Sequence, residues 1–425
     1  MSESTSAAPA AGIAAYIGMD WADQKHDVAL RSAAEPAKLE HSQIEHQPDA
    51  LMDWLGGLQR RFAGKGKILV SLEQSRGALI YHLMSYEFLE LYPINPSQLS
   101  SFRETFKPSG AKDDRPDAEL LCELLYCHRD RLKAWEPDDE LTRKLAFLNE
   151  GRRKAVDQRT GLANEIKSQL KVYFPLALQV LDNDCSTALA ADLLLQCSDL
   201  DSLQKQPAHQ LRKFFYAHNS RQEKKLLERL ALIKAAKPLT RDRAVIEPAA
   251  LRVQLLAQQL KGLLPYIARY EKQIAKLFDA HPDSFLFRDL PGAGPALAPR
   301  LLTAFGDDRD RFEHSIEFAS LSGIGPVRRA SGKKATIHFR NACPKFLRQS
   351  LHEFGWHSIR SCPWAKALYQ SLRERGKGHH AAVRAVTFKW IRVLFACWKQ
   401  RIPYDPERYL QALKTRGSVY AQTAP

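Results

Sequence analysis

Acidic residues are almost absent from one long stretch of this 425-residue chain. Between residues 319 and 402 there are two, Glu353 and Glu374, against seventeen lysines and arginines. Seventeen minus two leaves +15, which is the formal net charge of the whole chain, so the other 341 residues balance to zero. A segment with this charge repels itself unless a polyanion lies against it. We therefore expect this segment to form a nucleic-acid surface.

Other features are missing as well. No run reaches the roughly 18 apolar residues of a membrane helix, and residues 390–398 are interrupted by Arg392. The first twelve residues lack a basic start and an apolar core, so they predict a disordered tail and not a signal peptide. The seven cysteines have no metal-ligand spacing, and Cys122 and Cys127 with His128 fit a buried helix better than a zinc site. The odd cysteine count predicts reduced thiols in the cytoplasm.

The length predicts two to four domains. We expect an α/β domain over residues 13–137, a helical region over 138–280, a mainly helical domain over 281–412 and a tail over 413–425.

In the first of these domains, acidic residues stand at the ends of apolar, strand-like segments. Residues 16–20 and 26–31 predict a β-hairpin with Asp20 at the end of its first strand. After a helix over about 47–62, a strand over 67–73 ends at Glu73.

A third strand is expected over about 89–94, followed by a basic, mobile loop over 103–112. Pro116 fits the first turn of a helix, where Asp114 and Asp117 would share one face.

Four carboxylates on separate elements are what two divalent ions need for phosphoryl transfer. Any one of these acids alone is more often a solvated carboxylate or a helix cap. Together they favour a metal site. Asp23 and Asp27 are alternatives to Asp20, which is preferred because it directly ends the apolar strand.

The middle of the chain shows helical periodicity. Its second half alternates apolar spacings of three and four, which is typical of a coiled coil, and Pro265 should kink or break that helix. We expect two antiparallel arms within the chain and a surface for dimerisation. Residues 175–239 predict shorter helices with no assigned chemistry. The apolar residues with spacings of three and four in the second half are Val253, Leu256, Leu260, Leu263, Ile267, Tyr270, Ile274 and Leu277.

The carboxy-terminal region contains two further motifs. Residues 290–302 resemble a helix-hairpin-helix turn, whose backbone N–H groups can face a phosphate, although a plain connector fits as well. Ser331 lies in a polar loop, residues 328–334, among several cations, where a nucleophile for a phosphodiester would be placed. On local sequence alone an ordinary loop serine is the commoner interpretation. Ser322 is a rival, but its apolar surroundings suggest a structural role.

These motifs together resemble a known family. Gly18-Met19-Asp20, the strand ending at Glu73 and the segment 112–118 are similar to the DEDD centre of RuvC-like, RNase H-fold domains. More narrowly, they resemble insertion-sequence transposases of family 110, whose helix motif reads Lys-Thr-Asp-x-x-Asp-Ala. Asp113 stands where Thr is usual, so it competes with Asp114 as a ligand. The order and spacing of the motifs from residue 318 to residue 405 are similar to the transposase domain of the same family.

The resemblance implies an RNase H-like α/β amino-terminal domain, a helical coiled-coil middle and a mainly α-helical transposase domain. It implies a recombinase in which a bridge RNA pairs with donor and target DNA, in a prokaryotic cytosol. Ser331 would be the catalytic nucleophile, and Asp20, Glu73, Asp114 and Asp117 would hold Mg²⁺ or Mn²⁺. Serine and acids would meet within one chain or across a dimer, and strand exchange between two duplexes would need at least two dimers, assembled as a tetramer. The basic residues expected to bind nucleic acid are Arg328, Arg329, Lys333, Lys334, Arg340, Lys345 and Arg348.

Two other classes of function stay open. A hydrolytic RuvC-like junction nuclease would use the carboxylates and water, with no role for Ser331. A non-catalytic protein that binds RNA or DNA would need only the basic surface.

Overall fold

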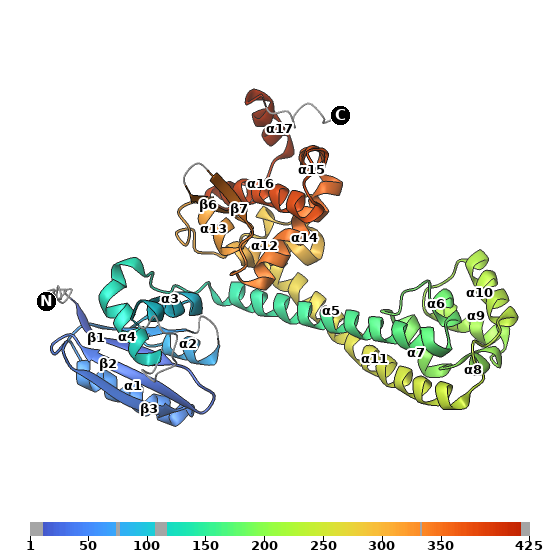
Figure 1. The fold of residues 1–425 in the computed structure, drawn as a ribbon, viewed down its shortest axis with the longest axis horizontal. Helices are drawn as coiled ribbons and strands as arrows, with labels where there is room; N and C mark the ends of the chain where they lie inside the picture. The colour runs from blue at the N-terminus through green and yellow to red at the C-terminus, as the bar shows by residue number, and fades with distance from the viewer. Residues whose placement is uncertain (1–11, 74–76, 107–116, 332–333, 418–425) are drawn as a thin grey trace. The chain divides into compact units, whose positions relative to one another are not determined.

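The computed structural model describes residues 12–73, 77–106, 117–331 and 334–417 (Figure 1). The chain forms two compact units, one up to Pro137 and one from Asp138 onward. The predicted tails lie largely outside the described residues, although the last helix continues to Thr415. Within the described ranges, no helix has the length and apolar character needed to cross a membrane.

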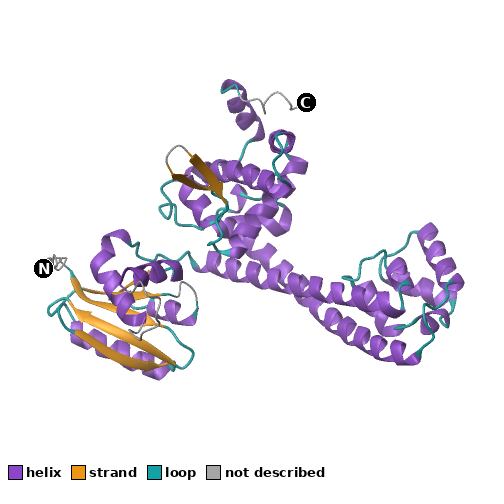
Figure 2. Ribbon diagram, in the orientation of Figure 1, coloured by secondary structure: helices purple, strands orange, loops and turns teal. Residues whose placement is uncertain are grey.

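A mixed five-stranded sheet forms the centre of the first unit (Figure 2). An antiparallel meander of β1 (Ile13–Asp20), β2 (Lys25–Ser32) and β3 (Leu39–Glu45) is followed by β4 (Lys67–Leu72) and β5 (Leu89–Pro93). β4 pairs parallel to β1 and β5 parallel to β4, so the spatial order is β3-β2-β1-β4-β5. The predicted α/β fold of this unit is therefore confirmed.

The edge strand β3 was not predicted from the sequence. Only Ile44 of its seven residues is buried, because one edge and much of its surface face solvent. Its sequence therefore shows none of the apolar alternation that identifies β1 and β4.

Helices cover both faces of the sheet. α1 and α2 pack on the face that carries Ile17 and Met19, and α4 packs on the opposite face against Tyr16. The alternation of side chains along β1 therefore directs Gly18 and Asp20 to the side of α4. The helices are α1 (Pro48–Phe62), α2 (Ala78–Leu83), α3 (Pro96–Phe106) and α4 (Asp117–His128), followed by a 3₁₀ turn (Arg129–Arg131).

Two long helices, α5 (Glu140–Tyr173) and α11 (Arg243–Ala280), pack along each other in the second unit (Figure 1). They are antiparallel: Arg152 near the start of α5 pairs with Glu271 near the end of α11, and Glu165 pairs with Arg252. The predicted seam is the face used for this packing, since Val253, Leu256, Leu260, Ile267 and Ile274 are all buried.

Proline does not interrupt α11. The helix is continuous through Pro248 and Pro265, so the predicted break at Pro265 is wrong. Pro265 is exposed, and so is Lys261, whose carbonyl loses its helical donor to the proline ring. Water can bind that carbonyl, while the buried face holds the helix against α5.

Five short helices fill the connection between α5 and α11, as predicted for residues 175–239. Their apolar residues form one core with the adjoining ends of the two long helices. They are α6 (Leu176–Val180), α7 (Ala188–Gln196), α8 (Leu200–Gln204), α9 (Ala208–Ala217) and α10 (Glu223–Ala235).

The remainder of the second unit, from residue 281, is mainly helical, as predicted. Its core is aromatic, and its buried indole N–H groups have partners: Trp390 donates to Ser358 Oγ (2.8 Å) and Trp398 to the Gly306 carbonyl (2.8 Å). After a 3₁₀ turn (Ser284–Leu286), the elements are α12 (Gly294–Phe305), α13 (Ser315–Leu321), β6 (Val327–Ser331), β7 (Lys334–His338), α14 (Lys345–Ser361), α15 (Pro363–Glu374), α16 (His379–Gln400) and α17 (Pro406–Thr415).

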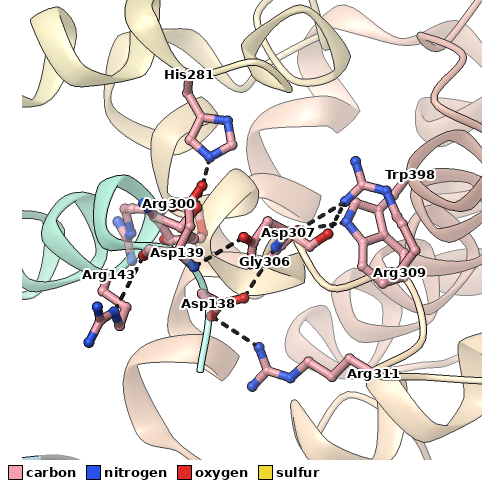
Figure 3. A network of polar contacts seen from close by, with 12 residues as sticks. Asp138, Asp139, Arg143, His281, Arg300, Gly306, Asp307, Arg309, Arg311 and Trp398 are labelled. Carbon is pink, nitrogen blue, oxygen red and sulfur yellow. Dashed lines mark hydrogen bonds and ion pairs between the residues drawn. The ribbon is translucent and has the colours of Figure 1, made fainter. Parts of the chain in front are cut away.

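A polar network attaches the start of α5 to the loop after α12 (Figure 3). The Asp307 N–H donates to Asp138 Oδ1 (3.2 Å), and the Asp139 N–H donates to Asp307 Oδ2 (3.0 Å). Burial and the hydrogen bond with Asp307 raise the pKa of the Asp138 carboxyl to about 6. Because the pKa of Asp307 is lowered, Asp138 is the more readily protonated of the two, and Arg311 Nη1 lies 3.4 Å from its Oδ2.

Candidate functional site

Three of the four predicted carboxylates lie at one end of the sheet in the first unit. Asp20 is the last residue of β1 and Glu73 directly follows β4. Because β1 and β4 are parallel neighbours with Met19 opposite Leu72, the two acids leave the sheet side by side. Asp117 is the first residue of α4, and Asp114 lies outside the described residues.

Gly18 allows α4 to approach β1 closely. A Cβ at this position would lie 2.0 Å from the Ala118 carbonyl oxygen and 2.4 Å from the Cys122 nitrogen. Both are backbone atoms of α4, so no side-chain movement could relieve the overlap. The glycine therefore brings the first turn of α4, and with it Asp117, to the end of β1 that carries Asp20.

Two small polar side chains fix this contact. The buried Ser71 hydroxyl on β4 lies 3.1 Å from the Ile17 carbonyl and 2.9 Å from the Leu121 carbonyl, so it can donate to either. The Cys122 thiol donates to the Tyr16 carbonyl at 3.5 Å, and burial raises its pKa to about 12. Cys122 is therefore structural, as predicted, whereas Cys127 on the same helix is exposed and not buried.

The three carboxylates influence each other electrostatically. Burial raises the pKa of Asp20, and the negative charges of Asp117 and Asp27 raise it further. The pKa of Glu73 is raised by burial and then by Asp117 and Asp20. Close carboxylates that repel each other in this way attract a cation.

A cation from the protein already lies among them. The guanidinium of Arg103 on α3 forms an ion pair with Asp117 Oδ1, and its charge lowers the pKa of both Asp20 and Glu73. The predicted mobile loop over 103–112 is wrong for residues 103–106, because α3 continues to Phe106, and residues 107–112 lie outside the described residues. Sequence reasoning therefore missed Arg103 as a member of this acid cluster (Asp20, Glu73, Asp117).

The acid cluster fits a hard divalent ion in the type of its donors, which are all carboxylate oxygens. Within the described part of the chain, however, no three His, Cys, Asp or Glu side chains stand close enough together to hold a metal ion. Asp117 Oδ1 instead accepts a hydrogen bond from Arg103 Nη2. Metal binding at these residues would therefore require Arg103 to release Asp117.

The alternatives to Asp20 are less well placed. Asp27 is the register partner of Asp20 across β1 and β2, but its Oδ1 accepts a hydrogen bond from Gln43 (2.8 Å). Asp23 is exposed in the connection between the two strands.

Ser331 is the last residue of β6 and not part of a loop, which corrects the prediction for residues 328–331. β6 and β7 form a two-stranded hairpin in which Ser331 pairs with Lys334 and Arg328 with Ile337. Gly332 and Lys333, between the strands, lie outside the described residues. Ile337 is 76% exposed, which is unusual for isoleucine. An isolated two-stranded hairpin is also only marginally stable in water. Such a surface suits contact with a partner.

The rival Ser322 is structural. It is fully buried, and its hydroxyl donates to the Ala319 carbonyl at 2.9 Å. No substrate can reach it in this position.

The acid Glu353 does not neutralise the basic segment that surrounds it in sequence. Its carboxylate accepts hydrogen bonds from Arg153 on α5 (3.1 Å) and from Arg300 on α12 (2.7 Å), both outside the segment. Glu353 therefore does not compensate the cations of residues 319–402, of which Lys399 pairs with Asp310 (3.6 Å) and Arg401 with Asp283 (3.1 Å).

Some predicted nucleic-acid contacts also hold the local backbone. Arg348 Nη1 donates to the Arg340 carbonyl (3.2 Å), and Lys345 Nζ donates to the Asn341 carbonyl (3.2 Å). Arg328 is exposed on β6.

The turn that resembles a helix-hairpin-helix packs against α14. Gly292 has φ +85°, and a Cβ there would lie 2.6 Å from the His357 backbone carbon. That face of the turn is occupied by protein, which favours a connector over a phosphate site.

Comparisons with known proteins agree on one family. A model of DEDD transposases of the IS110 type, described as "Transposase", matches residues 17–175, and a model described as "Transposase IS116/IS110/IS902 family" matches residues 285–370. The first match contains the acid cluster and the second contains Ser331.

Individual relatives span much of the chain. A Streptomyces coelicolor protein whose name describes a transposase for the IS117 mini-circle is 27% identical over 399 residues, covering 92% of this chain and 96% of its own. The 43.6 kDa protein of insertion element IS110 from the same organism is 25% identical over 70% of this chain and 73% of its own. The 42 kDa protein of IS900 from Mycobacterium paratuberculosis is 28% identical over 37% and 40%. The chain belongs to the IS110 family of transposases.

Proposed function

We propose that this transposase cuts and rejoins donor and target DNA through a covalent link to Ser331, with the acid cluster acting on the same phosphate. The observation that carries the proposal is the joint occurrence of two features. One is a set of carboxylates at the ends of β1 and β4 and at the start of α4. The other is a serine at the end of β6, in a segment with seventeen basic residues and two acidic ones.

The amino-terminal unit is proposed to be RNase H-like. Its mixed sheet, with a meander first and parallel strands after it, and acids at the ends of two adjacent strands support this assignment. In this proposal Asp20, Glu73, Asp114 and Asp117 would hold Mg²⁺ or Mn²⁺, which would supply charge neutralisation at the phosphate.

The chemical step conserves the phosphodiester. The Ser331 hydroxyl oxygen forms a bond to phosphorus, the bond from phosphorus to the 3′ oxygen breaks, and the serine proton ends on the leaving 3′ hydroxyl. Reversal by a 3′ hydroxyl from a second strand rejoins the DNA without ATP. Arg328 and its neighbouring cations bind non-bridging oxygens or, more simply, the DNA backbone.

Serine and acids lie on different units, so a productive site requires them to meet within one chain or between chains. Dimers assembling to a tetramer would provide the second arrangement. Exposed apolar side chains on α11, namely Leu251, Leu255 and Tyr266, support a contact with another copy. The family resemblance implies guidance by a bridge RNA. In that arrangement the protein binds the nucleic-acid backbone, and base pairing to the RNA selects the DNA sequence.

The test compares wild type, Ser331→Ala and Asp20→Ala, each incubated with donor DNA and guide RNA. An SDS-resistant protein–DNA adduct in wild type that is lost in Ser331→Ala is the expected result. Undiminished cleavage by Ser331→Ala would indicate the hydrolytic junction nuclease instead. Absence of strand breakage with every sample would indicate a protein that only binds nucleic acid.

A further inference from the structure

Two arginines contact an exposed aromatic ring where the hairpin joins the helices. Phe339 directly follows β7 and is 43% exposed. The guanidinium carbon of Arg348 on α14 lies 4.8 Å from the ring centroid, and that of Arg384 on α16 lies 4.7 Å from it. Two helices and the end of a strand thus bring two cations to one ring.

These two cations have no acidic counterpart among the described residues. Neither arginine forms an ion pair with a carboxylate there, and Glu353 on α14 is held by Arg153 and Arg300. Burial and the nearby charge of Arg348 lower the pKa of Arg384. Holding like charges together costs free energy unless an anion lies between them.

Histidines lie on the same two helices as this pair of arginines. His352 on α14 and His380 on α16 have ring centroids 5.5 Å apart, and His380 packs on His379 at 4.9 Å. The Tyr369 hydroxyl is hydrogen-bonded to His379 Nδ1 (2.8 Å). Burial lowers the pKa of His352, and His380 and Arg384 lower it further. Toward a bound anion each of these groups can donate a hydrogen bond, and the histidines can also gain a proton.

We propose that Arg348 and Arg384 form a phosphate clamp for one strand of nucleic acid, with Phe339 as the surface on which a sugar or base packs. Planar guanidinium groups bind phosphate through two parallel hydrogen bonds, and exposed aromatic rings stack on bases. Arg348 is fixed for this task, because it also donates to the Arg340 carbonyl. The clamp rests on the proposed function for the identity of its ligand.

The hairpin sets the distance from the clamp to the serine. Ser331 pairs with Lys334, and Phe339 lies five residues further along the chain. At about 3.3 Å per residue this separation is about 17 Å, which corresponds to about five nucleotides measured along the axis of a DNA duplex, at about 3.4 Å each. The clamp would therefore hold a phosphate about five nucleotides from the one that Ser331 attacks.

The test uses the full chain carrying Ser331→Ala, so that binding is measured without cleavage. Arg384→Gln is compared with Arg360→Gln, which removes the same charge from an exposed position on α14. The probes are a single-stranded DNA and an RNA of the same sequence, titrated over a range of salt. We expect Arg384→Gln to weaken binding about tenfold and to reduce the salt slope by about 0.7, with at most about a twofold effect of Arg360→Gln. The probe that loses more affinity identifies the strand.

Equal effects of the two substitutions on both probes would overturn the clamp, because they would indicate a general attraction by positive charge and not a defined phosphate site. Arg384→Lys, which keeps the charge without the planar group, is expected to recover the salt slope but not the affinity. A folding defect would appear as a lower unfolding temperature of both Arg384→Gln and Arg384→Lys, which the clamp does not predict. Replacing the phosphate about five nucleotides from the mapped cleavage position by a neutral methylphosphonate should weaken DNA binding by the wild type. The same replacement should leave DNA binding by Arg384→Gln unchanged. The binding comparison of Arg384→Gln with Arg360→Gln needs no covalent chemistry, so it can fail while the adduct test succeeds, and the reverse.

Discussion

The substitution Gly18→Ala tests whether close packing of α4 on β1 forms the acid cluster. The added Cβ would lie 2.0 Å from the Ala118 carbonyl oxygen, whereas ordinary contact begins at 3.4 Å, so α4 must retreat by about 1.4 Å. Overpacking of this kind costs about 1–3 kcal/mol of unfolding free energy. A displacement near 1 Å at reacting groups can reduce the rate about 100-fold, because Asp117 moves with α4.

The assay measures two quantities on the full chain: the urea midpoint of unfolding and the rate of DNA strand cleavage. Gly57→Ala in α1 is the control, since a Cβ there meets no atom within 4 Å and alanine should stabilise the helix by up to about 1 kcal/mol. We expect Gly18→Ala to lose both stability and cleavage while Gly57→Ala keeps both. Wild-type stability and cleavage in Gly18→Ala would refute the role assigned to this contact.

Two further substitutions test the electrostatics. Arg103→Gln frees Asp117, so Mn²⁺ should bind up to about fivefold more tightly in a titration followed by electron paramagnetic resonance; weaker binding would contradict the competition between Arg103 and the metal. The substitution Asp138→Asn removes the carboxyl group that takes up a proton. Because the folded-state pKa of Asp138 is raised from 3.8 to about 6, wild type should lose more stability than the variant as pH rises through that interval. Equal pH dependence of their urea midpoints would argue against this proton.

The sequence predicted the features that depend on apolar periodicity. Asp20 and Glu73 were found because a buried strand ends at each of them, and the two long helices because one stripe of α11 is apolar throughout. Family resemblance, and not periodicity, directed attention to Ser331. The roles of these residues in catalysis remain predictions.

Features that depend on tertiary contacts were not predicted. Arg103 joins the acid cluster only because α3 packs on α4, and no local pattern marks it. The pairing of Ser331 with Lys334 needs a hairpin whose exposed strands carry few buried residues. Gly18 did carry a signal, since a glycine within a buried strand often marks the close approach of another backbone.

The most direct measurement of the central claim identifies the residue that becomes attached to DNA. Wild-type protein is incubated with donor DNA and guide RNA, the adduct is digested with protease and nuclease, and the modified peptide is sequenced by mass spectrometry. We predict a nucleotide linked to Ser331 Oγ. A nucleotide on any other side chain, or cleavage that proceeds with no linked peptide, would contradict the account.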